Sequence, residues 1–233
     1  MEKKLCVIVP AYNEATVIQD VVRNSLKIFR KSSYDIDIVL INDGSKDATS
    51  AEAKKAGCIV IDHVLNSGAG GATATGLSYA NQNGYLGAAT MDADGQHDPS
   101  DVVKGFDKLF KSKHDLLIGS RLIDSRGMSR VKILGNWGLS FITRLLFGIK
   151  STDSQSGLRI YGSRALEELR WTTSGYEFCS EMLWRANQLG LSIGEFPIKV
   201  IYTDYSKGKG QSNWNAINIV KSLLKQRLAE IFE

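Results

Sequence analysis

Two aspartates and a glutamine occupy alternate positions in one short segment of the chain, as Asp92, Asp94 and Gln96. In an extended turn this spacing can direct both carboxylates at one point. Bare carboxylates about 4 Å apart repel each other by roughly 4 kcal/mol at an effective dielectric constant of about 20. A divalent cation that prefers oxygen removes this repulsion and can hold a diphosphate. We therefore predict that Asp92, Asp94 and Gln96 bind Mg²⁺ or Mn²⁺.

The same segment contains residues with predicted structural roles. Asp98 followed by Pro99 is typical of a helix N-cap with proline at the first helical position, so we assign the capping role to Asp98. His97 is expected to be structural, because magnesium and manganese prefer oxygen ligands. Neither role explains Asp92 and Asp94, which precede the cap and stay the predicted cation ligands.

Apolar runs typical of buried strands alternate with helical patterns along the first half of the chain. The expected strands are Leu5–Val9, Ile36–Ile41, Ile59–Ile61, Ala88–Met91 and Leu116–Ile118. The expected helices are Ala15–Arg30, Lys46–Lys55, Gly71–Asn81 and Pro99–Phe110. This order predicts an α/β fold with a mostly parallel central sheet and helices on both faces. The later elements are a helix near Glu177–Gln188, a strand pair near Ser192–Tyr202 broken by Pro197, and a helix near Asn213–Ile231.

Polar or glycine-rich segments follow four of the expected strands: Ala11–Glu14, Asn42–Ser45, His63–Gly71 and Asp92–Pro99. Ligands of open parallel sheets bind beyond the carboxyl ends of the strands, so these segments are the candidates for a binding site.

Three of the segments resemble the nucleotide-sugar site of family 2 glycosyltransferases, which have the GT-A fold: Val7–Glu14, Asn42–Ser45 and Asp92–Asp94. They occur in the order found in that family and span the first half of the chain. The resemblance implies a metal-dependent hexosyltransferase, with Asp43 on the base or ribose, although Asp43–Ser45 alone would be interpreted as a turn and helix cap. The residues implied to bind the nucleotide sugar are Pro10, Ala11, Tyr12, Glu14, Asp43, Asp92, Ala93 and Asp94.

The glycines between residues 66 and 72 could instead belong to a dinucleotide-binding fingerprint. Counting from Gly68 and Gly70, the third glycine position is Thr73, and the loop follows the third strand rather than the first. The loop resembles the glycine-rich loop of the same transferases, without the basic residue often found there.

The second half resembles dolichyl-phosphate mannose synthases and bacterial polyprenyl-phosphate glycosyltransferases, through Gly119–Arg121, Arg130, Asp153–Arg159 and a late loop, Tyr202–Ser212. Arg121 and Arg130 are candidate phosphate clamps, because guanidinium groups pair bidentately with phosphate oxygens. Arg159 could equally form a structural ion pair with Asp153. The residues implied to act in catalysis are Asp94, Arg121, Arg130, Lys207 and Lys209.

The resemblance implies inverting transfer of a sugar from a nucleotide diphosphate to a polyprenyl phosphate, such as undecaprenyl or dolichyl phosphate. Glucose or N-acetylglucosamine on UDP is favoured, with mannose on GDP next. Glu181 lies where hydroxyl-using members place a general base, but the second pKa of a phosphate is about 6, so this acceptor needs none. Two alternatives stay open: transfer to a saccharide hydroxyl in cell-wall or capsular polysaccharide synthesis, with Glu181 as base, and a noncatalytic nucleotide-sugar-binding protein.

The bulk composition limits these interpretations. A chain of 233 residues with 43% hydrophobic residues and 3 prolines suits one domain, 1–233, divided into a Rossmann-like nucleotide-sugar half (1–119) and an acceptor half (120–233) that ends in an amphipathic helix. A net charge of +4 suits phosphate ligands or an anionic membrane surface, and no nucleic-acid partner is expected. The three scattered cysteines fit no disulfide framework or zinc site and favour the cytoplasm.

Access to a lipid-linked acceptor requires contact with a membrane. The apolar stretch Leu5–Pro10 is too short for the core of a signal peptide. Gly138–Ile149 is the nearest approach to a membrane-spanning run, which needs about 20 apolar residues, and it contains Arg144. We hypothesise that this segment or the helix near Asn213–Ile231 docks on the inner membrane face or on a small membrane protein. Formation of a homo-oligomer stays open.

Overall fold

The computed structural model describes residues 4–125, 128 and 130–201 of the chain. Seven strands form one sheet in the order β3-β2-β1-β4-β6-β5-β7. The strands are β1 Lys4–Ala11, β2 Asp35–Asn42, β3 Ile59–Asp62, β4 Gly87–Thr90, β5 Leu116–Ser120, β6 Arg159–Gly162 and β7 Ile193–Pro197. β6 runs antiparallel to β4 and β5, and the other neighbouring pairs are parallel. The expected mostly parallel sheet is therefore confirmed.

The direction in which strands are added reverses at β1. β2 and β3 extend the sheet on one side of β1, whereas β4 pairs with β1 on the other side. Open parallel sheets bind ligands at such a reversal, beyond the carboxyl ends of the strands. The ends of β1, β2 and β4 are followed by the three segments that resemble a nucleotide-sugar site, so the topology brings them to one edge.

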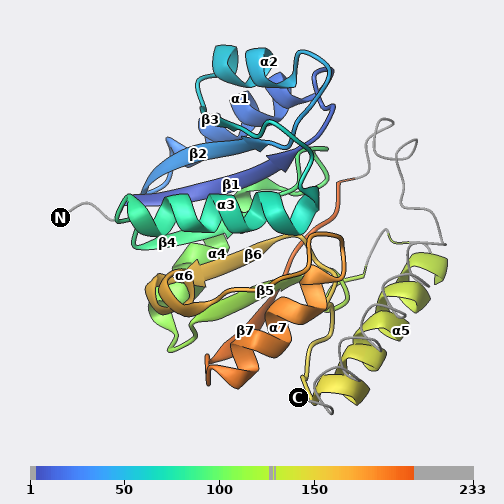
Figure 1. Cartoon of the computed structure of the whole chain (residues 1–233). Coiled ribbons are helices and arrows are strands. Elements are labelled where there is room, and N and C mark those ends of the chain that lie inside the picture. Colours follow the sequence, from blue (N-terminus) through green and yellow to red (C-terminus); the bar gives the residue numbers. More distant parts are fainter. Residues whose placement is uncertain (1–3, 126–127, 129, 202–233) are drawn as a thin grey trace.

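Helices cover both faces of the sheet (Figure 1). α1 Ile18–Phe29, α2 Thr49–Ala56 and α4 Pro99–Lys111 pack on one face. α3 Gly68–Gln82, α6 Ser163–Glu168 and α7 Phe178–Gln188 pack on the other, where α5 Arg130–Phe147 contributes Phe147 near its end. Two apolar layers, one on each side of the sheet, thus hold the strands that carry the site.

Local sequence explains where two of these helices lie. The side chain of Asp98 accepts a hydrogen bond from the Ser100 amide at 2.9 Å and Pro99 opens α4, which confirms the predicted N-cap. α3 packs tightly on β1 because Gly76 faces Ile8, where an added Cβ atom would collide with the Ile8 side chain. A larger residue at position 76 would push α3 away from the strand that ends in the candidate site.

The structure corrects several predicted elements. α3 begins at Gly68, three residues before the expected start, so the glycine-rich segment forms its first turn. Instead of the expected strand pair near Ser192–Tyr202, the described part of this segment contains the single strand β7 and an isolated bridge between His97 and Val200. β6 and α6 were not predicted, because β6 begins with Arg159 and ends with Gly162 and so shows no apolar run, and the six residues of α6 are too few to show a helical period.

Candidate active site

The turn after β4 brings Asp92 and Asp94 together. The positive φ angle of Gly95, 76°, allows the chain to turn back, and the Gln96 amide donates a hydrogen bond to Asp94 Oδ1 at 3.0 Å. The Gln96 side-chain amide donates to Asp94 Oδ2. Burial, and next the negative charge of Asp92, raise the pKa of the Asp94 carboxyl. The negative charge of Asp92 therefore acts on the Asp94 carboxyl.

His97 supports this turn from below the surface. It is 5% exposed, its Nδ1 accepts a hydrogen bond from the Asp92 amide at 3.2 Å, and its Nε2 lies 3.6 Å from Asp92 Oδ2. The backbone carbonyl of Gln96 also accepts a hydrogen bond from the Ile201 amide at 2.8 Å. The turn is thus held on both sides, in agreement with a structural role for His97.

The donor set of the turn fits an oxygen-preferring cation. Two carboxylates and the Gln96 amide oxygen are the ligand types that Mg²⁺ and Mn²⁺ take. A cation would also offset both the burial and the repulsion by Asp92 that raise the pKa of Asp94. No group of three or more His, Cys, Asp or Glu side chains able to hold a metal occurs within the described residues.

Residues from the second half of the chain reach the same turn. Thr90, at the end of β4, donates a hydrogen bond to the Gly157 carbonyl at 2.7 Å. Gly157 faces Asp92 so closely that an added Cβ atom would lie 2.8 Å from Asp92 Oδ2. Sequence patterns did not single out this contact, since Thr90 and Gly157 are 67 positions apart. A side chain at position 157 would displace a predicted cation ligand.

Arg121, the first residue after β5, forms an ion pair with Asp153. The Arg121 guanidinium donates to both carboxylate oxygens, at 2.6 Å from Nε and 2.7 Å from Nη2, and its backbone amide donates at 3.0 Å. Burial alone would lower the pKa of the Arg121 guanidinium. The hydrogen bond and negative charge of Asp153, and then the charge of Asp92, raise this pKa overall. Arg121 therefore stays a cation and lies within the field of the Asp92 turn.

Arg159 does not form the ion pair with Asp153 that the sequence allowed, because Asp153 pairs with Arg121. The Arg159 side chain is 1% exposed and donates hydrogen bonds to the backbone carbonyls of Ser154, Ser156 and Cys179. Arg159 therefore has an internal structural role and does not face a ligand.

Asp43 lies buried at the start of α3. Its carboxylate is engaged by the amides of Ser67 and Gly68, each at 2.8 Å, by the Ser67 hydroxyl at 2.7 Å and by His63 Nδ1 at 2.9 Å. Burial alone would raise the pKa of Asp43, but the hydrogen bonds, led by that of the Ser67 hydroxyl, lower it overall. Asp43 is thus an anion that closes the N-terminus of α3, with 3% of its surface exposed.

The glycines of the first turn of α3 pack against residues 171–174. The Gly70 amide donates to the Ser174 carbonyl at 2.8 Å, and the Trp171 indole donates to the Gly70 carbonyl at 3.1 Å. Added Cβ atoms at Gly68 and Gly70 would collide with the carbonyls of Ser174 and Thr173 respectively. The glycines therefore permit close backbone packing, which accounts for a glycine-rich loop without a basic side chain.

The end of β1 carries the remaining predicted nucleotide residues. Pro10 and Ala11 close the strand, and Tyr12 follows with 43% of its surface exposed. Asn13 has a φ of 55°, and its amide donates to the Ser45 hydroxyl at 2.9 Å, while the Glu14 amide donates to Thr49 Oγ1 at 2.8 Å. These bonds join the segments after β1 and β2 and leave the Tyr12 ring open for stacking.

Two kinds of comparison relate this geometry to known proteins. The sequence model of Glycosyl transferase family 2 matches residues 6–170. The chain belongs to this family. A UDP-N-acetylglucosamine–dolichyl-phosphate N-acetylglucosaminyltransferase of Methanococcus voltae is 39% identical over 100% of this chain and 99% of its own length. A polyprenol monophosphomannose synthase of Mycolicibacterium smegmatis is 28% identical over 96% of this chain and 85% of its own.

The family 2 chain also shares its fold with a solved structure, that of glucosyl-3-phosphoglycerate synthase from Mycobacterium tuberculosis in complex with Mn²⁺, UDP and glucosyl-3-phosphoglycerate. The TM-score is 0.73 with 17% identity, over 97% of this chain and 80% of that one. The expected GT-A fold is confirmed.

Glu181 is the candidate base for those family 2 enzymes that use a hydroxyl acceptor. In this chain it is fully buried in α7 and accepts four hydrogen bonds, from the amides and hydroxyls of Thr172 and Thr173, at 2.6 to 3.0 Å. Burial alone would raise the pKa of Glu181, but these bonds lower it overall. A carboxylate occupied in this way is poorly suited to accept a proton from an acceptor.

The remaining predicted residues lie at the edge of the described part of the chain or beyond it. Arg130 opens α5 and is exposed. Lys207 and Lys209 lie outside the described residues, as does the predicted helix near Asn213–Ile231.

Proposed function

We propose that this family 2 enzyme transfers a sugar, with inversion, from a UDP-sugar to a polyprenyl phosphate, and that the sugar is N-acetylglucosamine. One observation carries the proposal: the segment from Asp153 to Gly157 binds Arg121 at one end and faces Asp92 at the other, so it connects a cation for an anionic acceptor with the carboxylate turn for the donor diphosphate. The full-length similarity to the Methanococcus voltae enzyme supports the choice of donor. Glucose on UDP and mannose on GDP are the next candidates.

Charge neutralisation is the main requirement of this reaction. Near pH 7 the acceptor phosphate is already mostly anionic, so its oxygen attacks the anomeric carbon without a general base. Arg121 and Arg130 hold the acceptor phosphate, and Lys207 and Lys209 are the cations proposed for the diphosphate. Mg²⁺ or Mn²⁺, when bound by Asp92, Asp94 and Gln96, neutralises the leaving diphosphate.

The nucleoside is proposed to lie at the ends of β1 and β2. The exposed ring of Tyr12 offers a surface for the base, between Pro10, Ala11 and Glu14 on one strand end and Asp43 on the next. Since Asp43 already binds the start of α3, its role is to shape the pocket as much as to contact the ribose or base. The hydrogen bond from the Ile201 amide to the Gln96 carbonyl ties Ile201 to the turn proposed to bind the cation, and Ile201 precedes Lys207 by six residues in the sequence.

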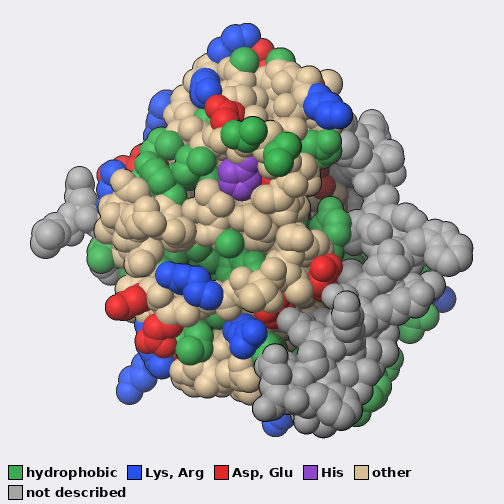
Figure 2. Space-filling model, in the orientation of Figure 1, with side chains coloured by type: hydrophobic (Ala, Val, Ile, Leu, Met, Phe, Trp, Pro, Cys, Tyr) green, Lys and Arg blue, Asp and Glu red, His purple; other side chains and the backbone are tan. Residues whose placement is uncertain are grey.

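Membrane contact is proposed to occur through α5. Five large apolar side chains, three or four positions apart, are 51% to 73% exposed along this helix: Val131, Leu134, Trp137, Phe141 and Leu145. Its inward face packs on the domain through Leu139, Leu146 and Phe147 and also carries polar contacts: Ser140 accepts from the Ser154 amide at 2.9 Å, and Thr143 is bonded to Ser180 at 3.0 Å. Hydrophobic side chains line the lower right margin in Figure 2, where Figure 1 places α5.

A helix that packs only on its own domain keeps its large apolar side chains on the buried face, whereas α5 also exposes five of them. α5 contains no acidic residue, and Arg130 and Arg144 are exposed on it, so the surface suits an anionic lipid bilayer. Within the described residues no helix has the length and apolar character to span a membrane. We therefore propose peripheral attachment at the inner membrane face.

The test is a transfer assay with purified protein and Mn²⁺. UDP-N-acetylglucosamine, UDP-glucose and GDP-mannose are each offered with undecaprenyl phosphate and, separately, with a saccharide acceptor. The proposal expects a glycosylated lipid phosphate from UDP-N-acetylglucosamine. Transfer to the saccharide alone would replace it with the hydroxyl-acceptor alternative, and binding of donor without any transfer or hydrolysis would favour a noncatalytic protein.

A further inference from the structure

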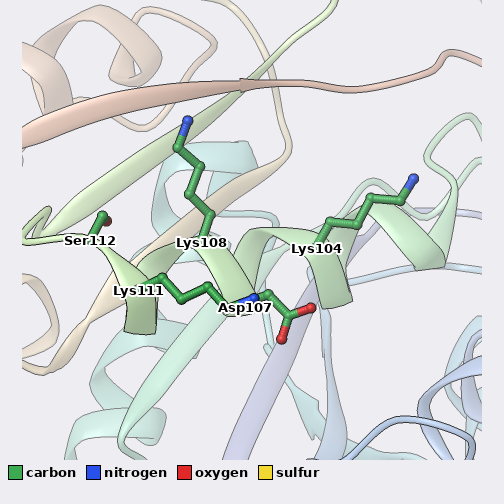
Figure 3. A pocket seen from close by; sticks show the side chains of 5 residues that line it. All are labelled: Lys104, Asp107, Lys108, Lys111 and Ser112. Atoms are coloured by element: carbon green, nitrogen blue, oxygen red, sulfur yellow. The ribbon is translucent and has the colours of Figure 1, made fainter.

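Glu195, on β7, binds the segment that carries Asp153. Its Oε1 accepts hydrogen bonds from the Ser151 hydroxyl at 2.8 Å and the Thr152 amide at 2.7 Å, and its Oε2 accepts from the Thr152 hydroxyl at 2.7 Å. The backbone of Glu195 is itself held, since Lys108 of α4 donates to its carbonyl at 2.6 Å. Lys108 points away from α4 in Figure 3, where it lines a hollow of about 400 Å³ together with Lys104 and Lys111.

The bonds of Glu195 continue to Arg121. Thr152 Oγ1 lies 2.7 Å from the hydroxyl of Ser120, which is the last residue of β5. The next residues on each side, Arg121 and Asp153, form the ion pair. Two successive cross-links therefore join the end of β5 to this segment, and Glu195 holds the segment from β7, the parallel neighbour of β5.

Glu181 also fixes a segment of the chain by hydrogen bonds, and this segment contacts the nucleotide half. Its four hydrogen bonds fix Thr172 and Thr173, and the next carbonyl, that of Ser174, receives the Gly70 amide in the first turn of α3. The same first turn of α3 also binds the Asp43 carboxylate, through the Gly68 amide. Each glutamate thus reaches one substrate-binding half through a pair of hydroxyl residues.

We propose that Glu195 and Glu181 are positioning residues for different substrates: Glu195 sets Arg121 for the acceptor phosphate, and Glu181 sets the start of α3 and Asp43 for the nucleotide. The inference rests on the proposed function and names residues outside its catalytic set. It assigns Glu181 a positioning role instead of a role as base.

The hydrogen-bond pattern predicts that glutamine rescues one position and not the other. Each oxygen of Glu181 accepts a backbone amide, from Thr172 or Thr173, so the NH₂ group of a glutamine would face an N–H donor. At Glu195 only Oε1 accepts a backbone amide, while Oε2 meets a hydroxyl that can rotate to accept from NH₂. Glu195→Gln should therefore keep the wild-type acceptor KM, whereas Glu195→Ala should not.

The experiment measures the KM of each substrate, UDP-N-acetylglucosamine with Mn²⁺ and a short-chain polyprenyl phosphate in detergent, for wild type and four variants. Glu195→Ala should raise the acceptor KM about tenfold and leave the donor KM within about twofold, since hydrogen bonds to charged groups carry that much free energy. Glu195→Gln should stay within about twofold for both. Glu181→Gln should raise only the donor KM, by about tenfold. Glu168→Ala, at a surface ion pair with Arg164, is the control.

Thr152→Val gives a second approach if Glu195→Ala does not fold, because it removes the hydroxyl that bonds both Glu195 and Ser120. It should also raise the acceptor KM. An unchanged acceptor KM in Glu195→Ala or Thr152→Val, or equal increases in both KM values, would overturn the inference. If the wild type transfers no sugar to the lipid phosphate, the proposed function fails instead.

Discussion

The Asp153 carboxylate binds Arg121 through three hydrogen bonds, although the two residues are 32 positions apart in the chain. Asp153 is fully buried and the Arg121 side chain is 21% exposed, so one edge of the guanidinium is occupied and the pair is only partly open to solvent. A cation held in this way keeps a fixed orientation before an anionic acceptor arrives. The pair is a link in the fold, and we propose that it is also the preformed part of the acceptor-phosphate site.

Replacing Asp153 by Asn should destabilise the protein, because it leaves the Arg121 charge without its buried partner. The expected loss in the free energy of unfolding is about 3 kcal/mol, measured by urea denaturation. Lys54→Met breaks the exposed ion pair with Asp62 and should cost less than about 1 kcal/mol. Equal effects of the two substitutions would contradict the assignment of a structural link to Asp153.

Replacing Asp94 by Asn should reduce sugar transfer by roughly a hundredfold or more, because it removes one of the two predicted carboxylate ligands. The fold should persist, since the side-chain oxygen of the introduced asparagine can still accept from the Gln96 amide. Transfer rates and Mn²⁺ affinity by calorimetry are the measurements. Undiminished turnover would remove the cation site from the proposal.

Asp98 offers a matched control for Asp94, as an aspartate four residues further along with a different role. Asp98→Ala removes the N-cap of α4 and should lower the free energy of unfolding by about 1 kcal/mol. Transfer per folded molecule should be retained, as judged by activity corrected for the melting curve. A loss of activity as large as that of the Asp94 variant would place Asp98 in the site.

The contribution of Glu181 to stability should depend on pH. Its pKa in the folded protein is lowered from the ordinary value of 4.5, so the stabilisation is complete above about pH 4.5 and is lost as the pH falls through the lowered pKa. The difference in Tm between wild type and Glu181→Gln should be constant from about pH 7 to 5 and shrink below about 4.5. A difference that grows on acidification would contradict the lowered pKa.

Attachment to anionic vesicles should depend on the exposed face of α5. Replacing Leu134 and Trp137 together by Ser should weaken binding to phosphatidylglycerol vesicles about tenfold or more, because two large side chains no longer leave water. The measurement is vesicle flotation. Leu86→Ser, at an apolar residue that is 45% exposed outside α5, should leave binding unchanged. Equal binding by all three proteins would exclude α5 as the contact.

Much of the nucleotide half could be predicted from the sequence, because its strands are continuous apolar runs and its polar residues directly follow them. The start of α3 was misplaced because glycine disfavours helix, and here contacts with the chain near Ser174 outweigh that preference. In the second half, the partner of Asp153 could not be deduced from local spacing. Arg159 is nearer in sequence, but tertiary packing turns it into the interior toward backbone carbonyls.

The reversed direction of β6 has a consequence for how such sites are searched for. A strand that runs against its neighbours places its beginning, rather than its end, at the edge where the parallel strands finish. Of the residues that lead into β6, Gly157 accordingly meets Thr90 and Asp92 at the end of β4, and Asp153 binds Arg121 at the end of β5. A search restricted to positions downstream of strands will overlook contacts such as that of Gly157 with Asp92 in this candidate site, whereas one that also inspects the approach to each antiparallel strand will find them.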